Sequence, residues 1–476
     1  MTTGEATAGQ AARWVARDAA VVWHGFTQMA TYPDQAPVMV DRAEGRELVD
    51  VDGRRYFDAI SSLWVVTLGH RVPALDEALR RQLDRVAHST MLGNGNRVVV
   101  ELAEALARVV PVDEPHVLFA SDGAVAVEQA LKIAFQHWVN RGEPGRRTFL
   151  ALGNAYHGDT IGALSVGDAG FGADVFDPLR FPVVRTPGYD DPAWAAKAVA
   201  ALDRHHRHLA AMVVEPLVQG AAGMLMAEPE DVRAVAEACR ERGVLLVADE
   251  VATGFGRTGW LFASEGCRIR PDLLCLGKGI TGGYLPMSAT VAAGPVFESF
   301  LGEDLGRRTF YHGHSYGGNA LAAAVALRHL ELLADGSVLA NVVERAEQLA
   351  DLARRSLIPH PAVATVRQRG LMAGVELAPP SPGARWGRRV CAAAVGRGIL
   401  LRPLGDVVVL VPPLTTTASE LSRSVSVLVE AMDQVMAEDG VPPRRRENLR
   451  PAAAAAAATA SPDGDRPPGA SRPPAP

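Results

Sequence analysis

The chain has 476 residues, of which 48% are apolar and 21% are charged, and its formal net charge is −6. This composition is typical of a folded protein and excludes a wholly disordered, a collagen-like or a coiled-coil chain. The charge offers no basic excess for nucleic acid or for an anionic membrane. No segment approaches the roughly 18 apolar residues of a membrane helix, and the first twenty residues lack the apolar core of a signal peptide. We therefore expect a cytoplasmic protein without nucleic-acid or membrane partners.

The four cysteines lie far apart in the sequence, at positions 239, 267, 275 and 391. They form no C-x-x-C pair, and their spacing gives no basis for a common metal site or for a disulfide framework. We therefore expect no metal ion in this protein.

Apolar runs and amphipathic segments alternate along most of the chain, which indicates an α/β architecture. The first helix signal is the helical spacing of Leu75, Leu79, Leu83 and Val86. Continuous apolar runs then predict buried strands of a parallel sheet at 116–120, 149–152, 211–214, 244–248 and 273–276. Polar residues follow the ends of these strands, which is where open α/β sheets bind their ligands.

The composition indicates two loose ends around two folded domains. We predict, in chain order, a flexible N-terminus, the first part of a small domain, a large domain, the second part of the small domain and a disordered tail rich in Pro and Ala: residues 1–20, 21–65, 66–330, 331–440 and 441–476. In the second part of the small domain, strands at 374–377 and 407–411 precede a helix. That helix is predicted to start at the capping box of Thr417 and Glu420.

Two segments resemble nucleotide-binding patterns only in part. Residues 244–250 are similar to the acidic strand end of a P-loop ATPase, but the chain lacks the G-x-x-x-x-G-K-[ST] loop that holds phosphates. Residues 254–259 fit G-x-G-x-x-G, but no amphipathic helix follows them, as a dinucleotide-binding unit requires. An ATPase and a nicotinamide-dependent oxidoreductase are therefore both disfavoured.

Several predicted strand ends carry residues whose chemistry fits together. Lys278 follows one strand between two glycines, and Asp249 ends another. Tyr156 and the turn Ser121-Asp122-Gly123-Ala124 follow two further strands. Each residue alone is more often a cap, an ion pair or a packing residue. Together they supply what pyridoxal phosphate needs: a lysine for the Schiff base, an acid for the ring nitrogen, an aromatic face and helix N–H groups for the phosphate.

Longer stretches resemble the class III aminotransferases, which are fold-type I pyridoxal phosphate enzymes, and these stretches are residues 249–259, 271–279 and 281–286. Other segments are similar to the branch of 7,8-diaminopelargonic acid aminotransferases in biotin synthesis, namely 23–29, 61–64, 87–93, 156–160, 215–220, 312–315 and 401–405. The resemblance spans most of the chain. It implies a large domain with a mostly parallel seven-stranded sheet, a smaller α/β domain from both chain ends, and a homodimer with shared active sites.

The resemblance also implies a role for each cofactor-binding residue. Lys278 is expected to bind pyridoxal 5'-phosphate and then to shuttle a proton, Asp249 to pair with the ring nitrogen, and Tyr156 to stack on the ring. The residues implied at the phosphate are Asp122, Gly123, Ala124 and, from the neighbouring subunit, the residue matching Ser315.

The implied reaction is the transamination of 8-amino-7-oxononanoate to 7,8-diaminononanoate, with S-adenosylmethionine or lysine as the amino donor. Arg402 matches the arginine that grips the substrate carboxylate, a task for which a planar guanidinium is well suited. The other implied substrate contacts are Trp64, Tyr156, Phe26, Asp159 and Gly313. The main alternative is a class III enzyme that acts on another ω-amino acid or on a polyamine; a cofactor-free binding homologue is disfavoured by the intact lysine and aspartate.

Several positions depart from the pattern of this branch, among them Gly25, where a proline is common, and the phosphate loop Ser121-Asp122-Gly123-Ala124, where Asp-Ser-Gly-Ser is common. Ala124 stands where a serine is common, so one hydroxyl contact to the phosphate is expected to be missing. Phe26, Leu63 and Val409 replace a tyrosine, a tryptophan and a tyrosine associated with members that use S-adenosylmethionine. Each replacement removes a hydroxyl group or an aromatic face that could hold an adenosyl group. If these three positions share one pocket, their replacement favours lysine as the donor.

Overall fold

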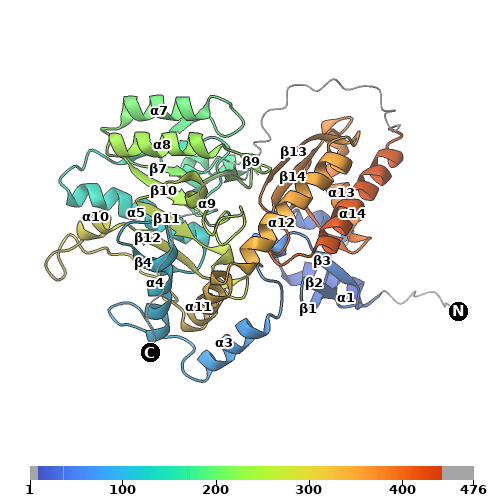
Figure 1. Cartoon of the computed structure of the whole chain (residues 1–476), viewed down its shortest axis with the longest axis horizontal. Coiled ribbons are helices and arrows are strands. Elements are labelled where there is room, and N and C mark those ends of the chain that lie inside the picture. The colour runs from blue at the N-terminus through green and yellow to red at the C-terminus, as the bar shows by residue number, and fades with distance from the viewer. Residues whose placement is uncertain (1–8, 36, 169, 171, 442–476) are drawn as a thin grey trace.

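Figure 1 shows the computed structural model of the chain, in which two lobes each contain a β-sheet core. The structure describes residues 9–35, 37–168, 170 and 172–441. The predicted disordered tail, from residue 442 onward, lies outside the described residues. None of the described helices is long and apolar enough to cross a membrane.

The larger lobe is built around a seven-stranded sheet with the order β4-β12-β11-β10-β7-β5-β6, in which β12 runs antiparallel to both neighbours. In that order the strands span His116–Ala120, Ser288–Ala292, Leu273–Leu276, Leu245–Asp249, Leu209–Val214, Thr148–Leu152 and Val184–Thr186. All five strands predicted from apolar runs lie in this sheet. The expected α/β fold with a mostly parallel seven-stranded sheet is therefore confirmed.

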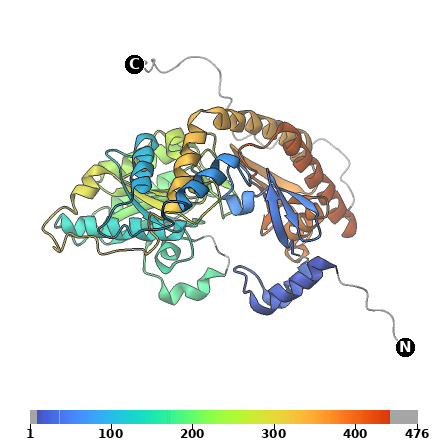
Figure 2. The ribbon, with the colours of Figure 1, turned by 90° about the horizontal axis from the view of Figure 1, so that it is seen from below.

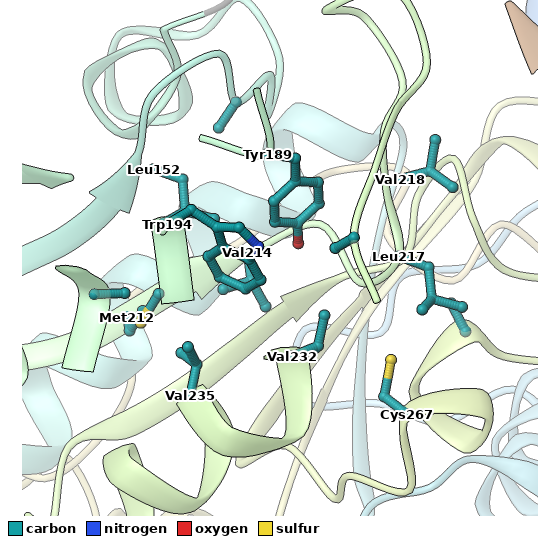
Figure 3. Close-up of a cluster of buried hydrophobic side chains, with 14 of the residues drawn as sticks. Leu152, Tyr189, Trp194, Met212, Val214, Leu217, Val218, Val232, Val235 and Cys267 are labelled. Atoms are coloured by element: carbon teal, nitrogen blue, oxygen red, sulfur yellow. The ribbon is translucent and has the colours of Figure 1, made fainter. Parts of the chain in front are cut away.

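Both faces of this sheet are buried, because alternate strand residues enter different core clusters. Met212 and Val214 of β7 pack in one cluster with helices α7 (Trp194–His205) and α8 (Pro229–Glu241). Ala211 and Val213 pack in another with helix α5 (Gly123–Asn140). Figure 3 shows the first cluster, where the rings of Tyr189 and Trp194 lie with their centroids 4.7 Å apart. Two-sided burial explains why these strands read as continuous apolar runs.

Segments from both ends of the chain build the smaller lobe, where blue strands lie beside orange and red elements in Figures 1 and 2. Its first sheet joins β1, β2 and β3 to β15, which pairs in parallel with β3, and these strands are Val40–Glu44, Glu47–Asp50, Arg55–Asp58 and Ile399–Leu400. Its second sheet has the order β13-β14-β17-β16, with bounds Val363–Arg369, Met372–Leu377, Val407–Leu410 and Arg402–Leu404.

Three helices complete the small lobe: α12, α13 and α14, at Ser337–Leu352, Trp386–Val395 and Ala418–Glu438. Phe57 of β3 shares a core cluster with Trp386 and Met432, so both ends of the chain contribute to one hydrophobic core. The capping box that starts α14 is confirmed, since the Thr417 N–H donates to Glu420 (2.8 Å) and the Glu420 N–H to the Thr417 hydroxyl (3.3 Å). The exact domain boundaries stay a prediction.

Residues 10–21 differ from the loose N-terminus that the sequence predicts, because they form helix α1 (Gln10–Val21). The helix buries no side chain, and polar contacts hold it instead. The Ala11 N–H donates to Asp52 (3.2 Å), and Asp18 lies 2.6 Å from the ring of His24. A helix held in this way leaves little apolar pattern in the sequence.

The turn after β3 has an uncommon backbone conformation. Its residues Ser61–Trp64 (α2) all have positive φ, at 49°, 45°, 71° and 68°. This left-handed conformation costs about 1–2 kcal/mol for each residue with a side chain. The buried guanidinium of Arg257 fixes the exit of the turn, donating to the carbonyls of Val66 (2.8 Å) and Pro412 (2.7 Å).

Candidate active site

The carboxyl ends of the sheet strands border a cavity of 860 Å³, whose wall combines residues of both lobes. The predicted site residues on this wall are Lys278, Asp249, Tyr156, Asp122, Gly123, Ala124, Trp64, Phe26, Asp159 and Arg402. The rule that ligands bind at the strand ends of an open α/β sheet therefore located the cavity from sequence.

Lys278 follows β11 after Gly277 and begins the 3-10 turn Lys278–Thr281, with a φ of 40°. Its Nζ is 5.1 Å from the centroid of the Trp64 ring. Burial lowers the pKa of the Lys278 amine below its usual value, and the negative charges of Asp249 and Glu215 offset this only in part. A lowered pKa favours the neutral amine, which is the form that attacks a carbonyl carbon.

Asp249 ends β10 and is only 5% exposed. Its Oδ1 accepts a hydrogen bond from the Val251 N–H (3.0 Å), and its Oδ2 lies 2.7 Å from Nδ1 of the buried His157. Burial alone would favour a neutral imidazole. The hydrogen bond to Asp249 and the charges of Asp249 and Glu215 outweigh burial and raise the pKa of His157.

Tyr156 is oriented at two points. Its backbone N–H donates to Glu215 Oε1 (3.0 Å), and its hydroxyl donates to Asp159 Oδ2 (2.8 Å). Burial and the bond to Asp159 hold the pKa of Tyr156 above its usual value. Glu215, at the end of β7, is 4% exposed, and burial raises its pKa to about 7. The aromatic ring is thus held at the cavity wall by both ends of the residue.

The start of helix α5 forms a cradle for an anion. Asp122 caps the helix by accepting a hydrogen bond from the Val125 N–H (3.0 Å). A Cβ atom on Gly123 would lie 2.6 Å from a methyl group of Val251, so this close approach requires glycine. The N–H groups and the dipole at a helix start favour a phosphate. Ala124 has no hydroxyl group, so it lacks the side-chain contact to a phosphate that a serine could make at this position, as the sequence implies.

Strand β16 brings Arg402 to the cavity wall. Within the described part of the chain, its guanidinium forms no ion pair with a carboxylate. A planar guanidinium that pairs with no carboxylate of the described residues is suited to bind the carboxylate of a small molecule in two parallel hydrogen bonds.

Three positions do not join this cavity. Gly313 and Ser315 are exposed in the segment before helix α11 (Ala320–Ala334), and the Ser315 carbonyl accepts a hydrogen bond from the His88 ring (2.8 Å). Val409, opposite Arg402 in the β16–β17 pair, is fully buried in the core cluster of the large sheet and does not line the cavity. The expectation that Phe26, Leu63 and Val409 share one pocket is therefore wrong for Val409.

Two ionisable residues on the cavity wall, His157 and Glu215, received no role from the sequence. Both lie in segments that the sequence analysis singled out, 156–160 and 215–220. Glu215 carries the same signal as Asp249, an acidic residue directly after a buried strand. The contact between His157 and Asp249 joins segments far apart in the chain, so no local pattern reveals it.

The model of the family described as "Aminotransferase class-III" matches residues 29–432 of the chain. The chain therefore belongs to the class III aminotransferases, a family of pyridoxal phosphate-dependent enzymes, and it is an aminotransferase.

Its relatives include proteins named adenosylmethionine-8-amino-7-oxononanoate aminotransferase. The one from Nitratidesulfovibrio vulgaris is 46% identical, over 89% of this chain and 82% of the relative. The crystal structure of the one from Methanocaldococcus jannaschii is 36% identical, with a TM-score of 0.85 over 89% of this chain and 98% of that chain. An omega transaminase from Pseudomonas jessenii in complex with PMP is 26% identical, with a TM-score of 0.84 over 90% of this chain and 99% of that chain.

Proposed function

We propose that the chain transfers an amino group to 8-amino-7-oxononanoate and so forms 7,8-diaminononanoate, a step of biotin synthesis. The observation that carries the proposal is the single cavity in which Lys278, Asp249 and Arg402 meet. The names of the relatives, at identities up to 46%, support this substrate.

The residues present fit pyridoxal 5'-phosphate. The cradle of Gly123, which a Cβ atom would fill, suits the phosphate, and Lys278 presents an amine with a lowered pKa. Asp249 would hold the ring nitrogen, and Tyr156 would cover the ring. When bound, the cofactor supplies an electron sink for charge that develops on the substrate carbon.

The protein's own groups then position the substrate and move protons. The Lys278 Nζ would move a proton at the substrate carbon, because it is the amine at the cavity wall. Arg402 would bind the acceptor carboxylate and so fix the far end of the chain of methylene groups. The Trp64 ring beside Nζ would limit water around the reacting carbon.

We propose S-adenosylmethionine as the amino donor. The relatives named for this donor support it. The replacements at Phe26 and Leu63 still favour lysine, but the third one, at Val409, lies outside the cavity wall. Asp159, on the wall, would pair with the cationic group of either donor.

We further propose a cytoplasmic homodimer with shared sites. Gly313 and Ser315 are exposed and lie outside the cavity of their own chain, which leaves them free to reach the cavity of a second copy. Ser315 would then contact the phosphate in that copy, and Gly313 its substrate. The small-molecule partners are the oxononanoate and the amino donor.

A donor panel tests the function directly. The purified protein, loaded with pyridoxal 5'-phosphate, is incubated with the oxononanoate and either S-adenosylmethionine or lysine, and diaminononanoate is measured by mass spectrometry. We expect product with S-adenosylmethionine and none with Lys278→Ala. Product with lysine alone would overturn the donor assignment. Turnover of small ω-amino acids or polyamines without any diaminononanoate would overturn the substrate.

A further inference from the structure

One buried carboxylate holds the start of the left-handed turn Ser61–Trp64. Asp58, the last residue of β3, is fully buried. Its Oδ1 accepts a hydrogen bond from the Ser62 N–H (2.9 Å), and its Oδ2 accepts one from the Ser62 hydroxyl (2.7 Å). The carboxylate therefore fixes the second residue of the turn at both its backbone and its side chain.

A histidine from beyond the turn completes this arrangement. Nε2 of His70 lies 3.0 Å from Asp58 Oδ2. An ionised carboxylate only accepts hydrogen bonds, so Ser62 and His70 are both donors. Burial lowers the pKa of Arg257 to about 10, and the negative charge of Asp58 offsets this effect in part. We term Asp58, Ser62 and His70 the Asp58 anchor.

Trp64, the last residue of the turn, depends on the backbone for its position. Its ring centroid lies 5.1 Å from Nζ of Lys278. Its Nε1 is buried without a hydrogen-bond partner among the described residues, so no hydrogen bond of the side chain fixes the ring. The ring packs closely on Gly220, where a Cβ atom would lie 3.0 Å from it. A small movement of the turn would therefore separate the ring from the cavity wall or press it into Gly220.

The backbone of the turn needs support from its surroundings. All four of its residues have positive φ, a conformation that persists at residues with side chains only where other contacts enforce it. The Ser61 hydroxyl donates to the Val411 carbonyl (2.7 Å), and Arg257 fixes the exit of the turn. Between these two points, Asp58 fixes Ser62.

We propose that the Asp58 anchor holds the left-handed turn in the shape that keeps the Trp64 ring against the Lys278 amine. Asp58 is then a positioning residue, which acts through Ser62. Hydrogen bonds to a carboxylate are charge-assisted and stronger than those between neutral groups, which suits this task. The effect on the reaction rests on the proposed function, in which Lys278 moves a proton and the Trp64 ring limits water around the reacting carbon.

The test follows Trp64 by ¹⁹F NMR in cofactor-free protein that carries 5-fluorotryptophan. Trp64→Phe identifies the Trp64 signal among those of the seven tryptophans. We expect Asp58→Ala to shift this signal, and Asp58→Asn, which keeps an acceptor for the Ser62 N–H, to shift it less. In the enzyme loaded with pyridoxal 5'-phosphate, Asp58→Ala should lower turnover of the oxononanoate about tenfold, because the reacting groups lose their alignment.

Asp50, at the end of the neighbouring strand β2, provides a matched control. It is 4% exposed and accepts three hydrogen bonds, from the N–H groups of Asp52 (3.0 Å) and Arg54 (2.8 Å) and from the hydroxyl of Tyr56 (2.7 Å). Its contacts are thus of the same kind as those of Asp58, but it lies away from the cavity wall. We expect Asp50→Ala to lower the free energy of unfolding and to leave the Trp64 signal and the turnover unchanged.

The ¹⁹F measurement needs neither cofactor nor substrate, so it decides the anchor even if the proposed function fails. A Trp64 signal that is the same in Asp58→Ala as in Asp50→Ala overturns the anchor. A shifted signal with unchanged turnover, in Asp58→Ala and in Trp64→Phe alike, supports the anchor and overturns the proposed role of Trp64 in the reaction. Should Asp58→Ala not fold, Ser62→Ala takes its place, because it removes one contact and no charge.

Discussion

Replacing Gly123 by alanine tests the phosphate cradle at its tightest point. The added Cβ would lie 2.6 and 3.0 Å from the two methyl groups of Val251, a residue that also lines the cavity. A branched valine cannot swing clear of such an overlap, so the start of α5 must shift. Overpacking of this kind costs about 1–3 kcal/mol of the free energy of unfolding. Loss of one charge-assisted hydrogen bond to the phosphate, about 1.5 kcal/mol, would weaken cofactor binding about tenfold.

The double variant Gly123→Ala/Val251→Ala makes the test specific, because Val251→Ala removes the two methyl groups that collide. We expect it to recover about 1 kcal/mol or more of the free energy of unfolding relative to the sum of the single changes. Gly95→Ala serves as the control, since a Cβ there has no neighbour within 4 Å. Stability is measured by urea unfolding and cofactor affinity by titration of the absorbance. A Gly123→Ala variant that matches Gly95→Ala in both measurements refutes the cradle.

Three further changes probe other parts of the site. Arg402→Ala should raise KM for the oxononanoate far more than KM for the donor, and Arg402→Lys should not restore it fully, because a point charge lacks the planar fork; equal effects on both substrates would indicate a structural role. Ala124→Ser should tighten cofactor binding by about 1 kcal/mol, the value of one added hydrogen bond, in equilibrium titrations. Lys278→Met should raise the free energy of unfolding of the cofactor-free protein at neutral pH, because the folded state disfavours the charged amine. This gain in stability should shrink as the pH rises toward 10.5, the usual pKa of lysine. A gain that grows with pH would contradict the lowered pKa of Lys278.

The functional residues at the strand ends could be predicted from the sequence, because parallel strands bring their carboxyl ends to one edge of the sheet. Asp249 ends β10 and Lys278 follows β11, and these two strands pair in parallel, so two local signals sufficed to place both residues at one edge. Strand β12 (Ser288–Ala292) escaped the sequence analysis, because Ser288 and Thr290 interrupt its apolar run. Thr290 is nevertheless fully buried, and its hydroxyl donates to the Ala126 carbonyl (2.8 Å).

Contacts between distant segments were beyond sequence reasoning. The burial of Val409 depends on how the small lobe packs against the large sheet, which a residue type alone does not encode. The pairing of His157 with Asp249 likewise needs both strand ends in space. Helix α1 was missed for a different reason, since it has no buried face to leave a pattern.

The left-handed turn Ser61–Trp64 lowers the stability of this protein and at the same time contributes to its active site. Four residues with side chains adopt a backbone that glycine alone adopts without strain, at a combined cost of about 4–8 kcal/mol. In return, the turn carries Leu63 and Trp64 on the cavity wall, with Trp64 beside the Lys278 amine. A glycine at position 63 would relax the backbone and remove part of that wall. Directed evolution for thermostability alone would therefore select against this turn, and a screen for stable variants needs an activity assay at every round.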